Sequence, residues 1–168
     1  PVTDEMKATF TGGRGFCLWM LWNAVKPQTQ WDDPENALVF SGGPIGGITA
    51  YPGTGKATVV TSSPQTHAVI DSNGGGYFGP YLKFAGWDAL SIVGKAAEDV
   101  IIVIDGDTGR ATIEAAPLEA LDTHLLSRQL TEMYAHNPRD MRSISVASAG
   151  AAADRGAYRR GAAGRQGA

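Results

Sequence analysis

A lysine that closes a glycine-rich turn is the first residue that could bind an anion. Gly53, Gly55 and Lys56 resemble the end of a phosphate-binding loop. The complete loop also needs a glycine five residues before the Gly-Lys pair and a hydroxyl residue directly after it. Ala50 and Ala57 occupy those two positions, so we do not expect this loop to bind a nucleotide.

Three consecutive glycines after an asparagine form a second candidate anion site. The segment 72–79 contains Asn73 followed by Gly74, Gly75 and Gly76. Glycine lets successive backbone N–H groups face one anion, and an asparagine side chain adds an amide donor and a carbonyl acceptor. The same composition is typical of a flexible β-hairpin loop, so composition alone leaves both interpretations open.

Two arginine-containing runs of small residues are weaker candidates. Arg14 lies in the run 12–15, directly before an apolar segment, and the free N–H groups at a helix start favour an anion. Arg159, Arg160 and Arg165 lie among small residues, where guanidinium groups could hold phosphate in a bidentate manner. A common glycine turn explains the first run as well, and a solvated basic tail is the simpler explanation of the second.

Composition excludes several kinds of site. Cys17 is the single cysteine among 168 residues, which rules out an internal disulfide, a Cys-only zinc site and a complete iron–sulfur site made by this chain alone. The net charge of −3 provides no broad basic field for a nucleic-acid backbone. The longest apolar run, 16–22, is too short to span a bilayer. The sequence shows no nucleophile–base pair, so we name no catalytic residue.

These residues must be positioned by helices and strands, and the predicted order of those elements indicates an α+β fold. Strands are numerous and do not alternate regularly with helices. Strands are predicted at 37–40, 57–61, 89–93, 100–104, 111–114 and 144–147, and helices at 16–25, 77–84 and about 123–135. The helix 16–25 is apolar on all sides, so we expect more than one partner to bury it, with Cys17 in the core. Residues 71–76 look like the most flexible segment, 105–109 is a hairpin turn, and Asp122 is the expected N-cap of the last helix.

Four segments, taken in order, match the motifs of one protein family. Residues 33–47 (DPENALVFSGGPIGG) are similar to a PENxLxFxxGPLxGT run, and 52–64 (PGTGKATVVTSSP) to PxxGRxxVVTKSP. Residues 71–89 (DSNGGGYFGPYLKFAGWDA) are similar to ANSGGxFGxELKFAGYDA, and 92–96 match IxGKA. Order and spacing make these segments more specific than any single glycine loop. Across residues 12–115, the chain resembles the N-terminal domain of the tungsten-dependent aldehyde:ferredoxin oxidoreductases.

The resemblance implies that two β-sheets form a base for a tungsten ion held by two pyranopterins, whose phosphates share Mg²⁺. The family's pterin-binding arginine falls on Lys56, which keeps the charge but loses the bidentate fork. The family's asparagine falls on Asn73, whose backbone carbonyl is expected to help hold the magnesium. Gly74, Gly75 and Gly76 would let the backbone lie against the pterin. This interpretation requires Lys56 and Asn73 to lie together.

A second phosphate-binding segment is implied in the tail. Residues 162–165 resemble the family's RAAGRGG run, with Gly161 in place of its first arginine and Arg160 one position earlier. We therefore expect Arg160, Gly161, Ala162 and Arg165 to contact the cofactor, and the backbone carbonyl of Ala162 to contact the magnesium.

The remaining expectations concern organisation. Residues 1–147 would form the pterin-cofactor-binding domain, and 148–168 would begin the second phosphate-binding segment, truncated. We also expect Arg14 to contact the cofactor, because the glycine-rich run 12–15 directly precedes the apolar helix.

By resemblance, the parent enzyme oxidises aldehydes to carboxylic acids at tungsten or molybdenum. Electrons then pass through a [4Fe–4S] cluster to ferredoxin or an electron-transfer subunit. The cluster ligands would come from the remainder of the polypeptide, and this chain alone would be inactive. A homo- or hetero-oligomer in the cytoplasm fits the family, and no nucleic-acid or membrane partner is expected.

Three alternatives stay open. One is the active-site subunit of a tungsten-containing aryl-CoA reductase of the benzoyl-CoA type. Another is a non-catalytic module derived from the same fold, which the lysine at position 56 slightly favours. The last is a glycine-rich α+β domain without a cofactor.

Overall fold

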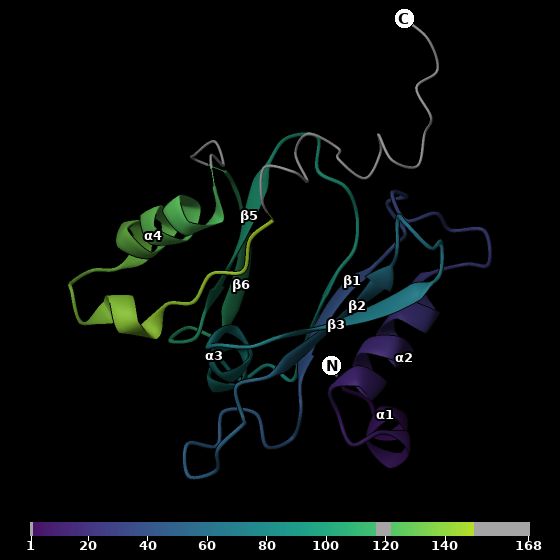
Figure 1. Cartoon of the computed structure of the whole chain (residues 1–168), viewed down its shortest axis with the longest axis horizontal. Coiled ribbons are helices and arrows are strands. Elements are labelled where there is room, and N and C mark those ends of the chain that lie inside the picture. Colours follow the sequence, from purple (N-terminus) through teal and green to yellow (C-terminus); the bar gives the residue numbers. More distant parts are fainter. Residues whose placement is uncertain (1, 117–121, 150–168) are drawn as a thin grey trace, which may run out of the picture. The chain divides into compact units, whose positions relative to one another are not determined.

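The computed structural model describes residues 2–116 and 122–149. The chain divides into two compact units, Pro1–Ser63 with His67–Ala115 and Pro64–Thr66 with Ala116–Ala168. The first unit contains α1 (Asp4–Thr9), α2 (Arg14–Ala24), β1 (Leu38–Gly42), β2 (Ala57–Ser62), β3 (Val69–Gly74), α3 (Phe78–Phe84), β4 (Ala89–Ile92), β5 (Val100–Asp105) and β6 (Arg110–Ala115) (Figure 1). The second contains α4 (Thr123–Tyr134) and the 3-10 helix η1 (Asp140–Ser143).

A four-stranded antiparallel sheet in the order β3-β2-β1-β4 organises the first unit. Its two central strands carry the apolar and β-branched runs that the sequence predicts as strands. Val39 of β1 pairs with Val60 of β2, and both side chains are fully buried. β5 and β6 form a separate two-stranded sheet. The predicted α+β class with two sheets is therefore confirmed.

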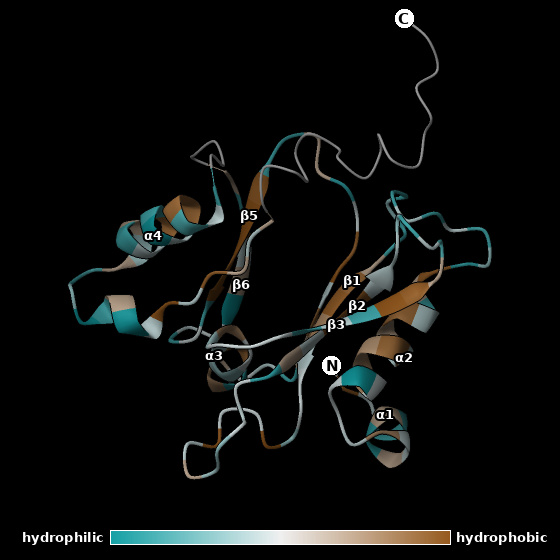
Figure 2. Cartoon of the chain, in the orientation of Figure 1, coloured by the Kyte–Doolittle hydropathy of each residue, from teal (hydrophilic) through white to brown (hydrophobic). Residues whose placement is uncertain are grey.

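Helix α2 covers one face of the four-stranded sheet. It begins at Arg14, where Gly13 adopts a φ of +54° that favours glycine. Cys17 and Leu21 pack against Val39 and Val60 in the core, and hydrophobic residues are prominent on α2, β1 and β2 in Figure 2. The expectation that several partners bury the helix is confirmed only in part. The sheet covers one face and the ring of Phe10 lies 6.0 Å from that of Trp19, but Trp22 remains 81% exposed, so the helix is not buried on all sides.

Helix α3 packs on the opposite face of the same sheet. Val39 and Phe40 are successive in β1, so their side chains point to opposite faces. The ring of Phe40 lies 5.4 Å from that of Phe78, the first residue of α3. A Cβ atom added to Gly79 would lie 3.0 Å from Cβ of Ala57, so this glycine lets α3 approach the start of β2 closely.

The hairpin β5–β6 closes through the predicted turn. Asp105 accepts a hydrogen bond from the Thr108 hydroxyl at 2.6 Å and from the Asp107 backbone N–H at 2.9 Å. These bonds stabilise the charged carboxylate and lower its pKa. The sequence predicts that the strands at 89–93, 100–104 and 111–114 lie close together. The first of them, β4, instead pairs with β1 in the four-stranded sheet.

The structure of three segments differs from what the local sequence indicates. Residues 71–76, expected to be flexible, lie largely in β3, because pairing with β2 supplies the order that the polar composition lacks. Residues 144–147 form no strand, since a short apolar run does not define one without a partner. Helix α1, which no pattern indicated, is capped by Thr3, whose hydroxyl accepts from the N–H of Met6 at 3.2 Å.

In the second unit, α4 begins as the sequence predicts. The side chain of Asp122 accepts a hydrogen bond from the backbone N–H of Leu125 at 2.7 Å, and Leu130 is buried. Among the described residues, no helix is both long enough and apolar enough to cross a bilayer.

Candidate functional site

The pairing of β2 with β3 brings Lys56 beside Gly75, two residues after Asn73. Thr58 lies opposite Asn73 in the ladder, and its hydroxyl donates a hydrogen bond to Asn73 Oδ1 at 3.3 Å. Lys56 precedes β2, and its Nζ atom lies 3.8 Å from the position that a Cβ atom on Gly75 would take. The strand register thus places Lys56 and Asn73 on neighbouring segments, and their role in binding a cofactor stays a prediction.

The backbone beside this lysine is bare. Among the described residues, a Cβ atom on Gly74 or Gly76 would have no neighbour within 4 Å, and one on Gly75 would meet only Lys56 Nζ. Gly76 has a φ of +96°, which side-chain-bearing residues rarely adopt. A Cβ atom on Gly55 would lie 3.0 Å from the Gly76 carbonyl oxygen, so the two glycine runs touch backbone to backbone.

An exposed cation beside bare backbone is suited to a flat, anionic ligand. A planar group can lie within van der Waals distance of glycine backbone, and the lysine ammonium provides a point charge for phosphate. We define the cradle as Lys56, Asn73 and the glycines 74–76. It leaves open the space that Cβ atoms would fill at 74–76, so these residues fit a pterin cofactor with phosphates.

Arg14 lies near the cradle but already has a partner. Its Nη2 atom is 2.5 Å from Oδ2 of Asp71. Asp71 and Asn73 are two residues apart in β3, so their side chains point to the same face of the strand. Arg14 is thus positioned by a carboxylate at the strand that carries Asn73.

Cys17 is a core residue, as expected from the sequence. It is fully buried, and its thiol donates to the backbone carbonyl of Thr58 at 3.6 Å. Burial raises its pKa to about 12 from a usual value of 9.0, so the thiol stays protonated. A single buried thiol cannot hold a [4Fe–4S] cluster, and residues 2–116 and 122–149 contain no group of three His, Cys, Asp or Glu side chains that could hold a metal ion.

The structure does not describe the second predicted phosphate segment. Arg160, Gly161, Ala162 and Arg165 are outside the described residues, so their proposed contacts stay predictions.

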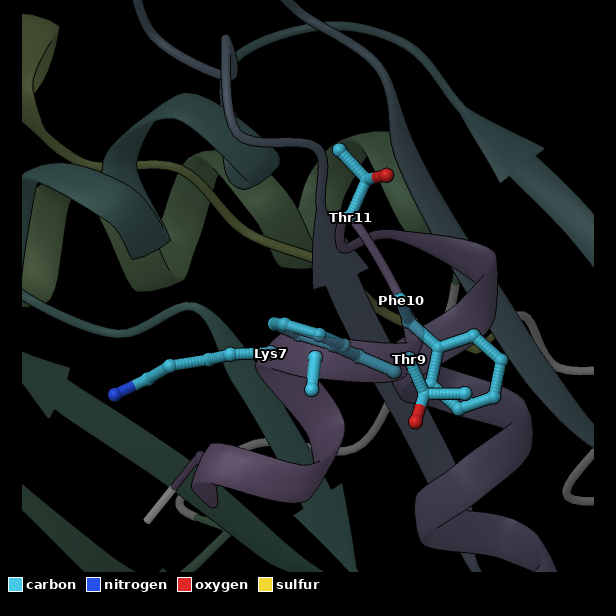
Figure 3. A pocket seen from close by; sticks show the side chains of 6 residues that line it. Lys7, Thr9, Phe10 and Thr11 are labelled. Atoms are coloured by element: carbon cyan, nitrogen blue, oxygen red, sulfur yellow. The ribbon is translucent and has the colours of Figure 1, made fainter.

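A separate open pocket of about 400 Å³ lies at the N-terminal end of the chain (Figure 3). It is lined by Lys7, Ala8, Thr9, Phe10, Thr11 and Phe16. None of the cradle residues lines it. In Figure 3 the Lys7 side chain extends away from Thr9 and Phe10.

Sequence reasoning missed Thr58 and Asp71. Both act through tertiary contacts, Thr58 on Asn73 and Asp71 on Arg14. The signal that could have found them is the strand register, since residues opposite or two apart share a face.

Comparisons with known proteins indicate the family to which the chain is related. The family model "Aldehyde ferredoxin oxidoreductase, N-terminal domain" matches residues 1–168. The tungsten-containing aldehyde ferredoxin oxidoreductase of Pyrococcus furiosus is 33% identical over 154 residues, which cover 90% of this chain and 24% of that protein. The corresponding enzyme of Thermococcus kodakarensis is 40% identical over 104 residues, covering 62% and 17%.

A solved structure shares the fold. It is the active site complex BamBC of benzoyl coenzyme A reductase in complex with 1,5 dienoyl-CoA, with a TM-score of 0.72 and 32% identity. The match covers 78% of this chain and 20% of the matched chain, so the chain spans only a minor part of its relatives. The chain belongs to the aldehyde ferredoxin oxidoreductase family of tungsten-containing oxidoreductases, in which it corresponds to the N-terminal domain.

Proposed function

We propose that the cradle is the seat of a bis-pyranopterin tungsten cofactor in an enzyme that oxidises aldehydes to carboxylic acids. The observation that carries the proposal is the approach of Lys56 Nζ to bare backbone at Gly75, beside Asn73. Membership of a tungsten-containing family supports the choice of cofactor. When bound, this group supplies the two-electron redox chemistry, and the protein supplies position and electrostatics.

Each cradle residue has a separate task in this proposal. Lys56 neutralises a pterin phosphate as a point charge. The backbone carbonyl of Asn73 would be a ligand of Mg²⁺, a hard cation that prefers oxygen ligands. Gly74, Gly75 and Gly76 would let the cofactor ring lie against the backbone. Once the ring covers these glycines, water is excluded from the surface between them.

The second half of the seat rests on the resemblance of the tail. Arg160, Gly161 and Arg165 would bind the other phosphate, and the carbonyl of Ala162 would be a further magnesium ligand. In this division, residues 1–147 are the cofactor-binding domain and 148–168 begin the second phosphate segment.

Electron transfer needs groups from other polypeptide segments. With a single cysteine here, the ligands of a [4Fe–4S] cluster would come from the parent protein, and ferredoxin or an electron-transfer subunit would accept the electrons. The proposed setting is the cytoplasm.

One other activity has a specific observation in its favour. The solved structure with the shared fold is part of a benzoyl coenzyme A reductase, so an aryl-CoA reductase is the second candidate. Both candidates use the same seat and differ in substrate.

The test uses the full-length polypeptide that carries this domain, purified without oxygen. We expect about one tungsten or molybdenum per chain and oxidation of aldehydes with a one-electron acceptor. Lys56→Met removes the positive charge that would pair with the phosphate and should lower the metal content, whereas Lys95→Met, at an exposed lysine outside the cradle, should not.

Three outcomes separate the alternatives. Reduction of an aryl-CoA ester without aldehyde oxidation would select the second candidate. A wild-type protein that binds neither metal would refute the enzyme and favour a non-catalytic module. Aldehyde oxidation by residues 1–168 alone would refute the need for the rest of the polypeptide.

A further inference from the structure

The strand that carries Asn73 is weakly held by its surroundings. In the part of the chain that the structure describes, β3 is an edge strand that pairs with β2 alone, and all six of its residues are exposed. An edge strand without burial gains little from packing and opens easily. A seat that uses the Asn73 carbonyl therefore needs another contact to hold β3 in place.

Helix α2 provides such contacts at its first turns. Arg14 pairs with Asp71 at 2.5 Å, which links the helix start to β3 across 57 positions of sequence. One turn further on, the Cys17 thiol donates to the Thr58 carbonyl, and the Thr58 hydroxyl donates to Asn73. The helix thus contacts both strands beside the cradle.

We propose that Asp71 is a positioning residue for the cofactor seat. By pairing with Arg14, it holds β3 against the start of α2 and keeps the backbone of Asn73 beside Lys56. Arg14 then acts through Asp71 and not as a direct phosphate ligand. The identity of the bound group rests on the proposed function, whereas the positioning of β3 does not.

The two roles of Arg14 predict opposite effects of Asp71→Asn. If the pair positions β3, Asp71→Asn and Arg14→Gln weaken the seat alike. If Arg14 binds phosphate itself, Asp71→Asn frees the guanidinium and strengthens cofactor retention, while Arg14→Gln weakens it. The sign of the Asp71→Asn effect therefore decides between them.

The first measurement is amide hydrogen exchange of the full-length protein, read in peptides from β3 and, as an internal reference, from β1. We expect Asp71→Asn and Arg14→Gln each to lower protection of Val69–Gly74 about fivefold, as for the loss of one partly exposed ion pair, and to leave Leu38–Gly42 unchanged. The reversed pair, Arg14→Asp with Asp71→Arg, should restore protection. Asp4→Asn breaks the exposed pair Lys7–Asp4 and is the matched control.

The second measurement is tungsten and magnesium per chain after dialysis against a chelator. We expect both β3-linked variants to lose metal faster than wild type, with partial rescue by Asp71→Glu. Unchanged protection of β3 in Asp71→Asn would overturn the proposal, as would improved metal retention. A wild type that binds no metal would refute the proposed function, and hydrogen exchange alone would then decide whether Asp71 positions β3.

Discussion

Adding one methyl group at Gly75 separates cofactor binding from folding. In Gly75→Ala, the new Cβ atom would lie 3.8 Å from Lys56 Nζ, an ordinary van der Waals contact, with no other neighbour within 4 Å. Gly75 is not among the glycines with positive φ, so alanine fits its backbone. Because alanine restricts the unfolded chain, we expect the free energy of unfolding to stay unchanged or rise by about 0.4–1 kcal/mol.

The same methyl group occupies the space assigned to the cofactor. We expect the methyl group to prevent one backbone hydrogen bond to a cofactor phosphate. Losing such a bond to a charged group costs about 1.5–3 kcal/mol, which corresponds to about ten- to a hundredfold weaker retention of the cofactor. The assay combines thermal unfolding with tungsten and magnesium content per chain. Gly43→Ala is the matched control, since Gly43 also has open space and no positive φ but lies in the loop after β1.

A third variant checks the geometry of the turn. Gly76→Ala should cost about 1–2 kcal/mol of stability, because the φ of +96° is unfavourable for alanine. Full metal content in a stable Gly75→Ala protein would show that no cofactor lies against this backbone, and the reasoning about the cradle would be wrong.

The remaining predictions concern charge, ionisation and the core. Lys56→Arg should retain the cofactor more tightly than wild type, because the guanidinium can bind phosphate through two bonds; equal or weaker retention on dialysis would contradict this role. The pKa of Cys17 is raised to about 12, so the unfolded state loses its proton above about pH 9 while the folded state keeps it. Stability should then fall by up to about 1.4 kcal/mol per pH unit between these values, and urea unfolding of Cys17→Ala should lack this contribution. Leu21→Ala, at a side chain 1% exposed, should cost about 2–5 kcal/mol, whereas Trp22→Ala at the next position should change stability by less than about 0.5 kcal/mol. Similar losses in both variants on chemical denaturation would show that Trp22 is covered.

Much of the fold followed from local signals in the sequence. The apolar and β-branched runs gave β1, β2 and β5, and Asp122 gave the start of α4. Such patterns are readable because side-chain periodicity and capping depend on neighbours within a few residues. The glycine motifs also gave the family, which the match to its N-terminal domain confirms.

The arrangement of the site was decided by tertiary contacts. Polar residues 71–74 became strand because β2 offered a pairing edge, and that register placed Asn73 opposite Thr58. The pairing of Arg14 with Asp71 joins residues that no local pattern relates. A sequence specifies which residues can bind an anion, whereas strand register specifies which of them share a face, because a shift of one residue turns every side chain to the other side.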